Sequence, residues 1–377
     1  MLTAQGCRAR RARLWERVGS DVDLILINAP WHIHYLANFY IASETLNLSS
    51  SSFLALDRDG SARLFVDNWT AGAARAAHVD EVIVYSWYDM RGPGRDRQAG
   101  VIAQLVAWLQ RARPRRVAVE ASHLPWAVAG PLVDSGATLV DVTPHLQAQR
   151  LQKDPDELAC IRRAVEVAAA GLAAARQAVR PGVSEFDVYF AVHAAATQAA
   201  QGVITMLGDF ASGERGAEGG PPTHRVLREG ELMIVDFFPL VDGYRADITC
   251  TYVAGVANAA QRRHMDLLLE AKAAGEAMLR PGVTGGEVYA AVRAVFARAG
   301  VADLFPHHAG HALGLMHPEP PFLVPDSQEP LRPNQVLTLE PGLYAADVGA
   351  MRIEDNYLIT EDGFTWGDLK ELTSPLS

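Results

Sequence analysis

The chain has 377 residues, of which 49% are hydrophobic and 21% charged, as is typical of globular proteins with one large or two ordinary domains. Its formal net charge of −10 argues against a broad nucleic-acid-binding surface, because phosphate binding requires a cationic surface. The three cysteines, Cys7, Cys160 and Cys250, lie far apart and have no CxxC spacing, so the sequence suggests neither a disulfide framework nor a thiolate zinc site and favours a reducing compartment.

The N-terminal segment, MLTAQGCRARRARLWERVGS, is basic but contains no apolar run of the length found in a signal peptide. No stretch of the chain approaches the roughly 18 apolar residues of a membrane span. The sequence therefore favours an amphipathic first helix over a targeting segment. We expect a cytoplasmic protein with neither a membrane nor a nucleic-acid partner.

Residues 22–66 alternate the apolar runs DLILINA, SSFLALD and ARLFVD with turn-forming residues. A helical pattern, VIAQLVAWLQRAR, follows these runs. The combination predicts a small α/β domain that ends near residue 150. We assign residues 1–150 to this N-terminal domain and residues 151–377 to a second domain.

The second domain contains an internal repeat. RPGVSEFDVYFAVHAAA at 180–196 returns as RPGVTGGEVYAAVRAVF at 280–296, an offset of 100 residues. In each copy Pro-Gly ends one helix, and Ser184 or Thr284 is placed to cap the next. The repeat predicts two equivalent helix-turn-helix units, each covering half of a sheet, with a site between the halves.

Two aspartates stand out in the apolar segment between the repeats. ELMIVDFF and YRADITCTYVAG predict strands joined at Asp242-Gly243, a strong hairpin signal. With those two residues as the loop, Asp236 pairs opposite Thr249, and Asp247 projects from the same face. Pro239 cannot donate to the ladder, so we expect a register shift, a bulge or an edge position near the turn.

Carboxylates that share a partly buried face repel each other unless a proton, an arginine or a metal ion compensates. A divalent cation is the most economical answer, and a surface turn with solvated aspartates is the alternative. Three further segments supply matching side chains: HHAGHALGLMH at 307–317, VLTLEPGLY at 336–344 and GAMRIEDNYLIT at 349–360. Carboxylates with one imidazole suit Mn, Fe, Co or Zn, and two such ions can polarise a carbonyl and generate hydroxide.

These motifs resemble, in order, those of the creatinase, aminopeptidase P, prolidase and methionine aminopeptidase family. The pattern is an aspartate, a second aspartate eleven residues later, a Gly-His pair, Glu-Pro-Gly and Arg-Ile-Glu-Asp, across roughly residues 150–365. Residues 23–40, DLILINAPWHIHYLANFY, resemble the family's N-terminal domain more loosely. The resemblance implies an α/β (α+β) protein whose C-terminal domain is a pita-bread fold with a pseudo-twofold repeat.

The resemblance also implies a dinuclear site with a bridging hydroxide and two divalent ions, Mn²⁺ first and Zn²⁺, Co²⁺ or Fe²⁺ as alternatives. Glu340 would also act as the general base, and His317 would face the substrate carbonyl or the developing oxyanion. Arg352 is a candidate to bind a substrate carboxylate, or is the structural partner of the neighbouring glutamate. The implied metal ligands are Asp236, Asp247, His311, Glu340 and Glu354, with Asp247 and Glu354 bridging.

Two departures from the family pattern stand beside these matches. His317 lies six residues after His311, whereas seven is usual, and HPEPP replaces His-Glu-x-Pro. The family has a histidine about eleven residues before the position of Gly230, where this chain has Gly219, Gly220 and Pro221. Either the loop at residues 210–224, hereafter the altered loop, is rebuilt so that His224 reaches the site, or another group has taken the role. We interpret His307 and His308 as structural or orienting residues.

The family resemblance favours hydrolysis of the peptide bond before proline, as an Xaa-Pro dipeptidase or an Xaa-Pro aminopeptidase. The expected substrate is a small peptide with proline at the second position, and the expected assembly is a homodimer. A same-fold lyase or amidohydrolase acting on a small molecule is the alternative, motivated by the altered loop. A non-catalytic binding protein ranks last because the ligand set is complete.

Overall fold

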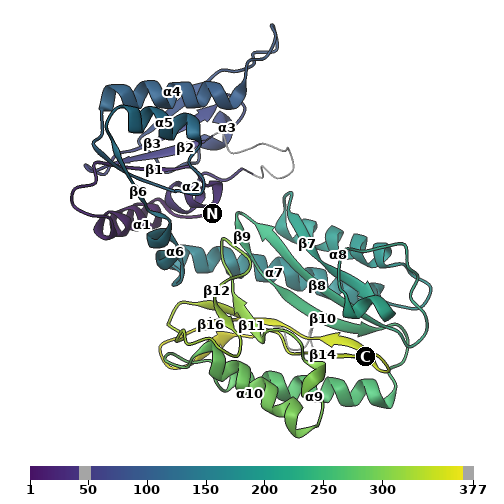
Figure 1. Ribbon diagram of the computed structural model, residues 1–377. Helices are drawn as coiled ribbons and strands as arrows, with labels where there is room; N and C mark the ends of the chain where they lie inside the picture. The colour runs from purple at the N-terminus through teal and green to yellow at the C-terminus, as the bar shows by residue number, and fades with distance from the viewer. Residues whose placement is uncertain (42–51, 368–377) are drawn as a thin grey trace. The chain divides into compact units, whose positions relative to one another are not determined.

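The computed structural model describes residues 1–41 and 52–367, and the chain divides into two compact units, Met1–Arg150 and Leu151–Ser377 (Figure 1). Both units combine helices with sheets, which confirms the predicted α/β class. No helix within the described ranges is long and apolar enough to cross a membrane.

The first unit is built on a six-stranded mixed sheet of order β4-β3-β2-β1-β5-β6, in which β1 pairs antiparallel with β2 and parallel with β5. Its strands are β1 (Leu24–Ile27), β2 (Phe53–Asp57), β3 (Ala62–Asp67), β4 (Glu81–Tyr85), β5 (Arg116–Val119) and β6 (Thr138–Asp141). Its helices are α1 (Ala4–Arg17), α2 (Pro30–Ala37), α3 (Ala71–Ala74), α4 (Arg97–Ala112), α5 (Trp126–Asp134) and α6 (Thr143–Arg150).

The core of the first unit follows from the apolar spacing of α4. Val101, Leu105 and Leu109 recur at helical intervals on one face and are buried against the central strands. The predicted first helix is confirmed as α1, whose N-cap Thr3 accepts a hydrogen bond from the Gly6 amide at 3.0 Å. The apolar spacing of α4 and the N-cap of α1 therefore follow directly from the local sequence.

The second unit contains a four-stranded sheet (β10-β8-β7, with β9 on β8), a five-stranded sheet (β12-β11-β13-β16-β17) and a β14-β15 pair. Its strands are β7 (Thr205–Ser212), β8 (Leu232–Val241), β9 (Tyr244–Arg245), β10 (Ile248–Val253), β11 (Gly310–Ala312), β12 (Glu319–Leu323), β13 (Val336–Leu339), β14 (Gly342–Ala345), β15 (Gly349–Arg352), β16 (Asp355–Ile359) and β17 (Phe364–Trp366). Its helices are α7 (Pro155–Ala178), α8 (Glu185–Ala200), α9 (Ala259–Glu276) and α10 (Gly285–Arg298), with short 3₁₀ helices η2 (Gly213–Ala217) and η3 (Ala302–Leu304).

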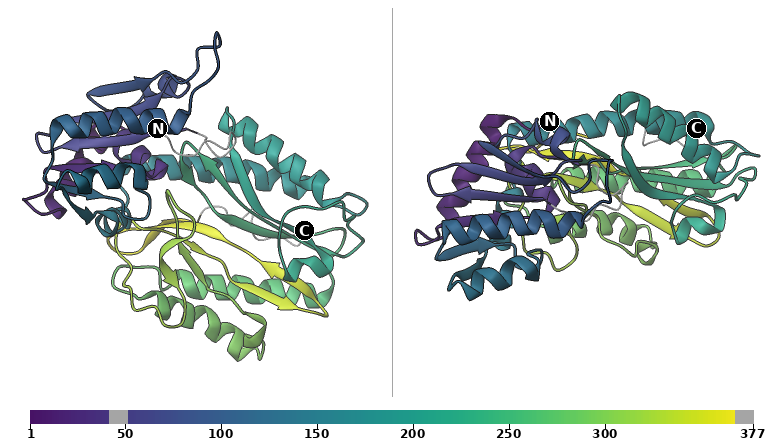
Figure 2. Two further views of the ribbon diagram at one scale, coloured as in Figure 1. Left: turned by 45° about the horizontal axis from the view of Figure 1, so that its top comes forward. Right: turned by 90° about the horizontal axis from the view of Figure 1, so that it is seen from above.

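The helices of this unit form two pairs, and each pair contacts a different sheet (Figures 1 and 2). Helices α7 and α8 pack on β8 and β7, whereas α9 and α10 pack on β13 and β12. The predicted caps are confirmed: Ser184 opens α8 and Thr284 opens α10, each within a capping box completed by Asp187 or Glu287.

The two copies of the repeat also share their backbone pairing. The Gly182 amide donates to the Leu227 carbonyl at 2.9 Å, and the Gly282 amide donates to the Leu331 carbonyl at the same distance. Both glycines have positive φ, 87° and 88°, which a residue with a side chain adopts only with strain. The same glycine turn and backbone hydrogen bond therefore precede the second helix of each pair, α8 and α10.

A glycine in each long helix lets a site-bearing strand approach closely. A Cβ on Gly171 of α7 would lie 2.5 Å from the Phe237 ring, and one on Gly275 of α9 would lie 2.9 Å from Leu339. Phe237 follows Asp236 in the chain, and Leu339 precedes Glu340. Close packing of each helix on its strand therefore helps to fix how deeply a candidate carboxylate is buried, Asp236 in one half of the unit and Glu340 in the other.

The acidic hairpin has the predicted register, with Asp236 of β8 opposite Thr249 of β10. The two-residue loop is Asp242 and Gly243, whose φ values of 50° and 84° fit a type I′ turn. The expectation for Pro239 is wrong. Strand β8 lies between β10 and β7, and the pairing keeps one register on both sides of the proline. The ladder is interrupted opposite Pro239, at residues 246–247, so its missing N–H is accommodated without a shift.

A buried glutamate holds both ends of the altered loop. Glu185 is fully buried and accepts hydrogen bonds from the amide and hydroxyl of Ser212, both at 2.8 Å. It also accepts from the amide and hydroxyl of Thr223, at 2.9 and 2.7 Å, and pairs with Arg215. The conformation of residues 212–223 therefore depends on this one carboxylate.

We expect Glu185→Ala to lower the free energy of unfolding by roughly 2–4 kcal/mol, because several buried donors lose their charged acceptor. Burial raises the pKa of Glu185, but hydrogen bonds from Thr223 and Ser212 outweigh it, so the net pKa lies below 4.5. The stabilisation is thus present above about pH 4.5 and lost as pH falls through the folded-state pKa. Urea titrations at pH 7, with exposed Glu218→Ala as control, test this; equal loss in both variants would contradict it.

Candidate metal centre

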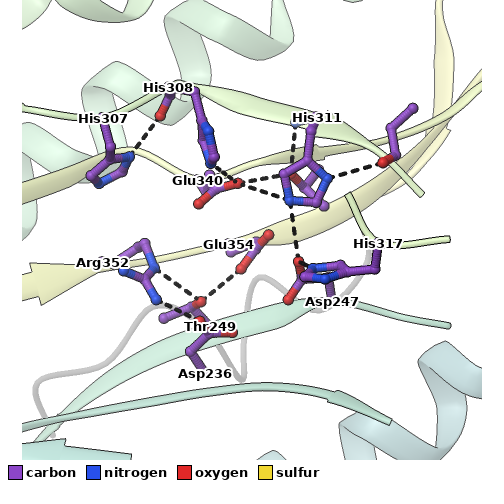
Figure 3. A network of polar contacts seen from close by, with 12 residues as sticks. Asp236, Asp247, Thr249, His307, His308, His311, His317, Glu340, Arg352 and Glu354 are labelled. Carbon is purple, nitrogen blue, oxygen red and sulfur yellow. Dashed lines mark hydrogen bonds and ion pairs between the residues drawn. The ribbon is translucent and has the colours of Figure 1, made fainter. Parts of the chain in front are cut away.

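Two buried aspartates from the acidic hairpin form one side of the candidate site (Figure 3). Asp236 and Asp247 are 8% and 4% exposed, which rules out the alternative of a solvated surface turn. The second half of the unit helps to position Asp247, because the Asp247 amide donates a hydrogen bond to Asn356 Oδ1 at 3.2 Å. Both carboxylates lie where the two sheets of the unit meet.

The other half of the unit supplies an imidazole and two glutamates. His311 lies in β11, Glu340 directly follows β13, and Glu354 lies between β15 and β16. The Glu354 amide donates to the Thr249 carbonyl at 2.9 Å, and the Thr249 hydroxyl donates to Glu354 Oε2 at 2.6 Å. These bonds attach Glu354 to the hairpin that carries the aspartates.

His311 is oriented by its own backbone. Its Nδ1 donates to the Ala312 carbonyl at 3.0 Å, which leaves Nε2 directed at the carboxylates. Nε2 lies 3.4 Å from Asp247 Oδ2 and 3.5 Å from Glu340 Oε1. This tautomer is the one that a metal-binding imidazole requires.

The structure brings all five predicted ligands together. Their ligand atoms form overlapping groups in which all atoms lie within 4.8 Å of one another. Four of the five residues, Asp247, His311, Glu340 and Glu354, each belong to two groups, so the groups share members as neighbouring cation sites would. The groups found among the described residues are Asp236–Asp247–Glu354, His311–Glu340–Glu354, Asp247–His311–His317 and His307–His308–Glu340.

Unsatisfied buried oxygens show that these residues suit a cation. Within the described part of the chain, Asp236 Oδ1, Asp247 Oδ1 and Glu354 Oε1 are buried without a hydrogen-bond partner. A buried carboxylate oxygen without a donor is costly unless a cation lies beside it. Oxygen ligands with one imidazole are also the donor set preferred by Mn²⁺, Fe²⁺ and Zn²⁺.

The pKa shifts of the buried carboxylates also indicate that the site suits a cation. Burial raises the pKa of Asp236 well above its usual range, and the Arg352 guanidinium only partly offsets the effect. Burial also raises the pKa of Glu354 well above its usual range, and repulsion from Asp247 adds to it. Both shifts show that these buried carboxylates lack sufficient compensating positive charge, which a bound cation would supply.

Asp247 and His311 form an oppositely shifted pair. Burial raises the pKa of Asp247, but hydrogen bonds from His311 and His317 outweigh it and the net pKa is lowered. Burial lowers the pKa of His311, but Asp247 and Glu340 raise it to about 9. The imidazole of the metal-free site therefore carries a proton at neutral pH.

Metal binding should for this reason release protons. Because His311 must be neutral to bind a cation, we expect the apparent Kd to fall about tenfold per pH unit from pH 6.5 to about 9. Release of protons from Asp236 and Glu354 would make the dependence steeper. Calorimetric titration of the metal-free protein with Mn²⁺, in buffers of different ionisation enthalpy, measures the proton count. An affinity that does not vary with pH would contradict this expectation.

Arg352, the candidate for binding a substrate carboxylate, is already occupied by protein groups. Its Nη2 donates to Asp236 and, at 3.3 Å, to Asp209 Oδ2. Nη1 donates to the Tyr344 hydroxyl at 2.7 Å, and Nε donates to Thr249 Oγ1 at 3.3 Å. All three nitrogens of this mostly buried guanidinium thus have acceptors.

The remaining histidines of the 307–317 segment surround the site. His317 Nε2 bonds to Asp247, and its ring stacks on Phe238 with 4.3 Å between centroids. His308 Nε2 lies 3.1 Å from Glu340 Oε1. Burial lowers the pKa of His307 to about 4, so this ring is neutral.

Comparison with known proteins identifies the family. The model of metallopeptidase family M24 matches residues 159–361, which is more than half of the chain. The chain belongs to metallopeptidase family M24. The creatinase/prolidase N-terminal domain matches residues 10–152 of the same M24 chain.

Several M24 relatives are similar to this chain. The Xaa-Pro dipeptidase of Pyrococcus furiosus is 32% identical over 220 residues, 57% of this chain and 62% of that protein. The uncharacterized peptidase YqhT of Bacillus subtilis is 33% identical over 234 residues, 61% of this chain and 66% of that protein. The alignments thus span less than two thirds of these relatives.

The fold is shared over nearly the whole chain. An Xaa-Pro dipeptidase structure from Bacillus anthracis superposes with a TM-score of 0.80 at 24% identity, covering 95% of this chain and 96% of that one. This similarity confirms the predicted arrangement of a creatinase-like N-terminal domain and a pita-bread M24 domain.

The structure does not bring His224, a candidate catalytic residue, into the ligand groups. His224 is exposed, its ring lies 4.8 Å from that of Phe186, and it joins none of the ligand groups among the described residues. Sequence analysis missed Asp209 of β7, which pairs opposite Asp236 and contacts Arg352. A carboxylate inside the apolar run TMLGDFAS was the available signal, of the same kind as in the hairpin.

Proposed function

We propose that this M24 protein is a metal-dependent peptidase that hydrolyses the bond preceding proline in small peptides, as an Xaa-Pro dipeptidase or an Xaa-Pro aminopeptidase. The observation that carries the proposal is the meeting of five ligands from both halves of the unit, with three buried carboxylate oxygens left unsatisfied. The activity named for the Pyrococcus furiosus relative supports the substrate class.

We assign the ligand role to the five residues that the resemblance implies, with Asp247 and Glu354 shared between two cations. Two divalent ions there, of which Mn²⁺ is our first choice, would supply Lewis acidity toward the scissile carbonyl and a hydroxide nucleophile near neutral pH. The ligand residues are Asp236, Asp247, His311, Glu340 and Glu354.

We assign Glu340 to proton transfer and His317 to binding of the carbonyl oxygen. Glu340 Oε1 accepts a hydrogen bond from Thr338 Oγ1 at 3.1 Å and lies beside His308, which keeps the carboxylate oriented and ionised. We assign it the general base that takes the proton of the attacking water. His317 belongs to the ligand group with Asp247 and His311, and its Nε2 bonds to Asp247 here. We assign this Nε2 as the donor to the oxyanion once bound cations take up the Asp247 carboxylate.

Further proposals concern the domains, the assembly and the compartment of the chain. We propose a creatinase-like N-terminal domain, residues 1–150, and a catalytic domain, residues 151–377. We also propose a homodimer in the cytoplasm; the three free, buried cysteines are consistent with a reducing compartment.

The test is a hydrolysis assay. Purified protein, stripped with chelator and restored with Mn²⁺, is incubated with a panel of Xaa-Pro dipeptides, longer Xaa-Pro peptides and Xaa-Ala controls. We expect turnover of the proline peptides only. Absence of any Xaa-Pro turnover with Mn²⁺, Co²⁺, Zn²⁺ or Fe²⁺ would overturn the proposal.

A second candidate is a same-fold lyase or amidohydrolase acting on a small molecule. It is favoured by one observation: the loop position that carries a histidine in the family is a glycine here, and Asp209 lies beside it. Failure of the peptide panel together with full metal occupancy would favour this candidate.

A further inference from the structure

A carboxylate that the metal ligands do not include lies at the Asp236 end of the site. Asp209 of β7 is directly opposite Asp236 of β8, and side chains directly opposite in an antiparallel pair lie on the same face. Its side chain is 35% exposed, whereas that of Asp236 is 12% exposed. Asp209 therefore lies at the solvent side of the buried ligands.

The altered loop is shaped around this carboxylate. The Gly220 amide donates to Asp209 Oδ1 at 2.7 Å. A Cβ on Gly219 would lie 2.7 Å from Asp209 Oδ2, and Gly219 has a φ of +71°, so the present loop has no room for a side chain there. Asp209 consequently occupies space next to the position where the family pattern has a histidine.

Like charges opposite each other in a sheet are destabilising, so the pair must be compensated. Arg352 supplies the compensation, because its Nη2 donates to Oδ2 of both Asp209 and Asp236. In turn, Asp209 takes up hydrogen-bonding capacity of the guanidinium that a substrate carboxylate would otherwise use. The arginine thus serves as an internal counter-ion.

The sum of the charges in the site indicates how a substrate carboxylate would be received there. The carboxylates of Asp236, Asp247, Glu340 and Glu354 balance two divalent cations, and the positive charge of Arg352 balances the hydroxide of the proposed site. Asp209 adds one further negative charge. A free carboxylate one residue beyond the scissile bond, as in a dipeptide, then enters a site with no net positive charge and meets repulsion from Asp209.

We propose that Asp209 is a specificity-determining residue that disfavours substrates with a free carboxylate next to the scissile bond and favours amide-capped or longer peptides. This inference rests on the proposed peptidase function and narrows it toward the aminopeptidase branch. Asp209 acts on the ratio between two substrates and takes no part in bond cleavage.

The experiment compares two substrates that differ by one charge, Ala-Pro and its C-terminal amide. The Mn²⁺-loaded full-length protein is assayed as wild type, as Asp209→Asn and as Glu218→Gln. Asparagine keeps the oxygen that accepts from the Gly220 amide, and Glu218 is an exposed acidic residue of the same loop. Thermal unfolding of the three proteins verifies that each is folded.

We expect wild type to have the higher kcat/KM for the amide. In Asp209→Asn the amide-to-acid ratio should fall about 5- to 10-fold, mainly because the acid is hydrolysed better, as expected for one unit charge near a protein surface. The Glu218→Gln ratio should stay at the wild-type value. An Asp209→Asn ratio equal to that of wild type would overturn the inference while leaving the peptidase function intact.

A binding measurement gives a second readout that needs no turnover. Calorimetry with L-proline and L-prolinamide should show that Asp209→Asn binds proline about 5- to 10-fold more tightly than wild type does and binds prolinamide with little change. If no protein hydrolyses Ala-Pro or its amide, the panel of longer Xaa-Pro peptides decides the proposed function, and this comparison still decides the role of Asp209. Equal changes in affinity for both compounds would indicate a merely structural residue and overturn the inference.

Discussion

Asp247→Ala should remove both cations and reduce kcat/KM for an Xaa-Pro peptide by roughly 10³-fold or more, because Lewis-acid stabilisation contributes several kcal/mol. Asp247 is a suitable test because it belongs to two of the ligand groups and one of its oxygens is buried without a partner, as is also true of Glu354. Alanine leaves its backbone amide free to donate to Asn356 as before. The measurements are metal content by elemental analysis and steady-state kinetics.

The control for this variant is Asp266→Ala, which removes an exposed aspartate from α9. It should retain wild-type metal content and activity. Two ions per chain in Asp247→Ala would show that the assignment of Asp247 as a shared ligand is wrong. Loss of metal from both variants would indicate a general loss of folding instead.

Glu340→Gln should lower kcat by about 10²- to 10⁴-fold with a much smaller effect on KM, the range expected on removal of a general base. Burial alone would raise the pKa of Glu340, but the hydrogen bond from His308 and the nearby positive charges of His311 and Arg352 together lower it, so the carboxylate is ionised at neutral pH and able to accept a proton. Glutamine keeps a neutral oxygen ligand with the same reach. The substitution therefore separates proton transfer from metal binding better than alanine does.

The measurement is a comparison of kcat, KM and metal content between Glu340→Gln and wild type. His308→Gln is a useful companion, because His308 contacts Glu340 without belonging to the predicted ligand set. We expect it to lower kcat less than Glu340→Gln does. A Glu340→Gln enzyme with wild-type kcat would exclude this residue as the base.

Those parts of the site that depend on local signals are predictable from the sequence. The Asp242-Gly243 turn fixes the hairpin register and therefore places Asp236 opposite Thr249. The caps at Ser184 and Thr284 follow from the repeat in the same way. Neighbouring residues in the sequence determine the hairpin register and the two helix caps, and tertiary packing does not change them.

Features that depend on long-range pairing are not predictable by the same means. Asp209 reaches the site because β7 pairs with β8 across the altered loop, and nothing near Gly208 or Asp209 in the sequence specifies that partner. Pro239 was expected to shift the register, yet the pairs on both sides and the neighbouring β7 keep it in place. Arg352 could be assigned its acceptors only once both sheets were in position.

The most direct test of the account is the number of cations that the wild-type protein binds. Chelator-stripped protein is titrated with Mn²⁺, freed of unbound metal, and analysed for metal per chain alongside activity on an Xaa-Pro peptide. The account predicts two ions per chain, with activity rising as the sites fill. Activity in the stripped protein, or no bound ion at saturating Mn²⁺, would contradict it.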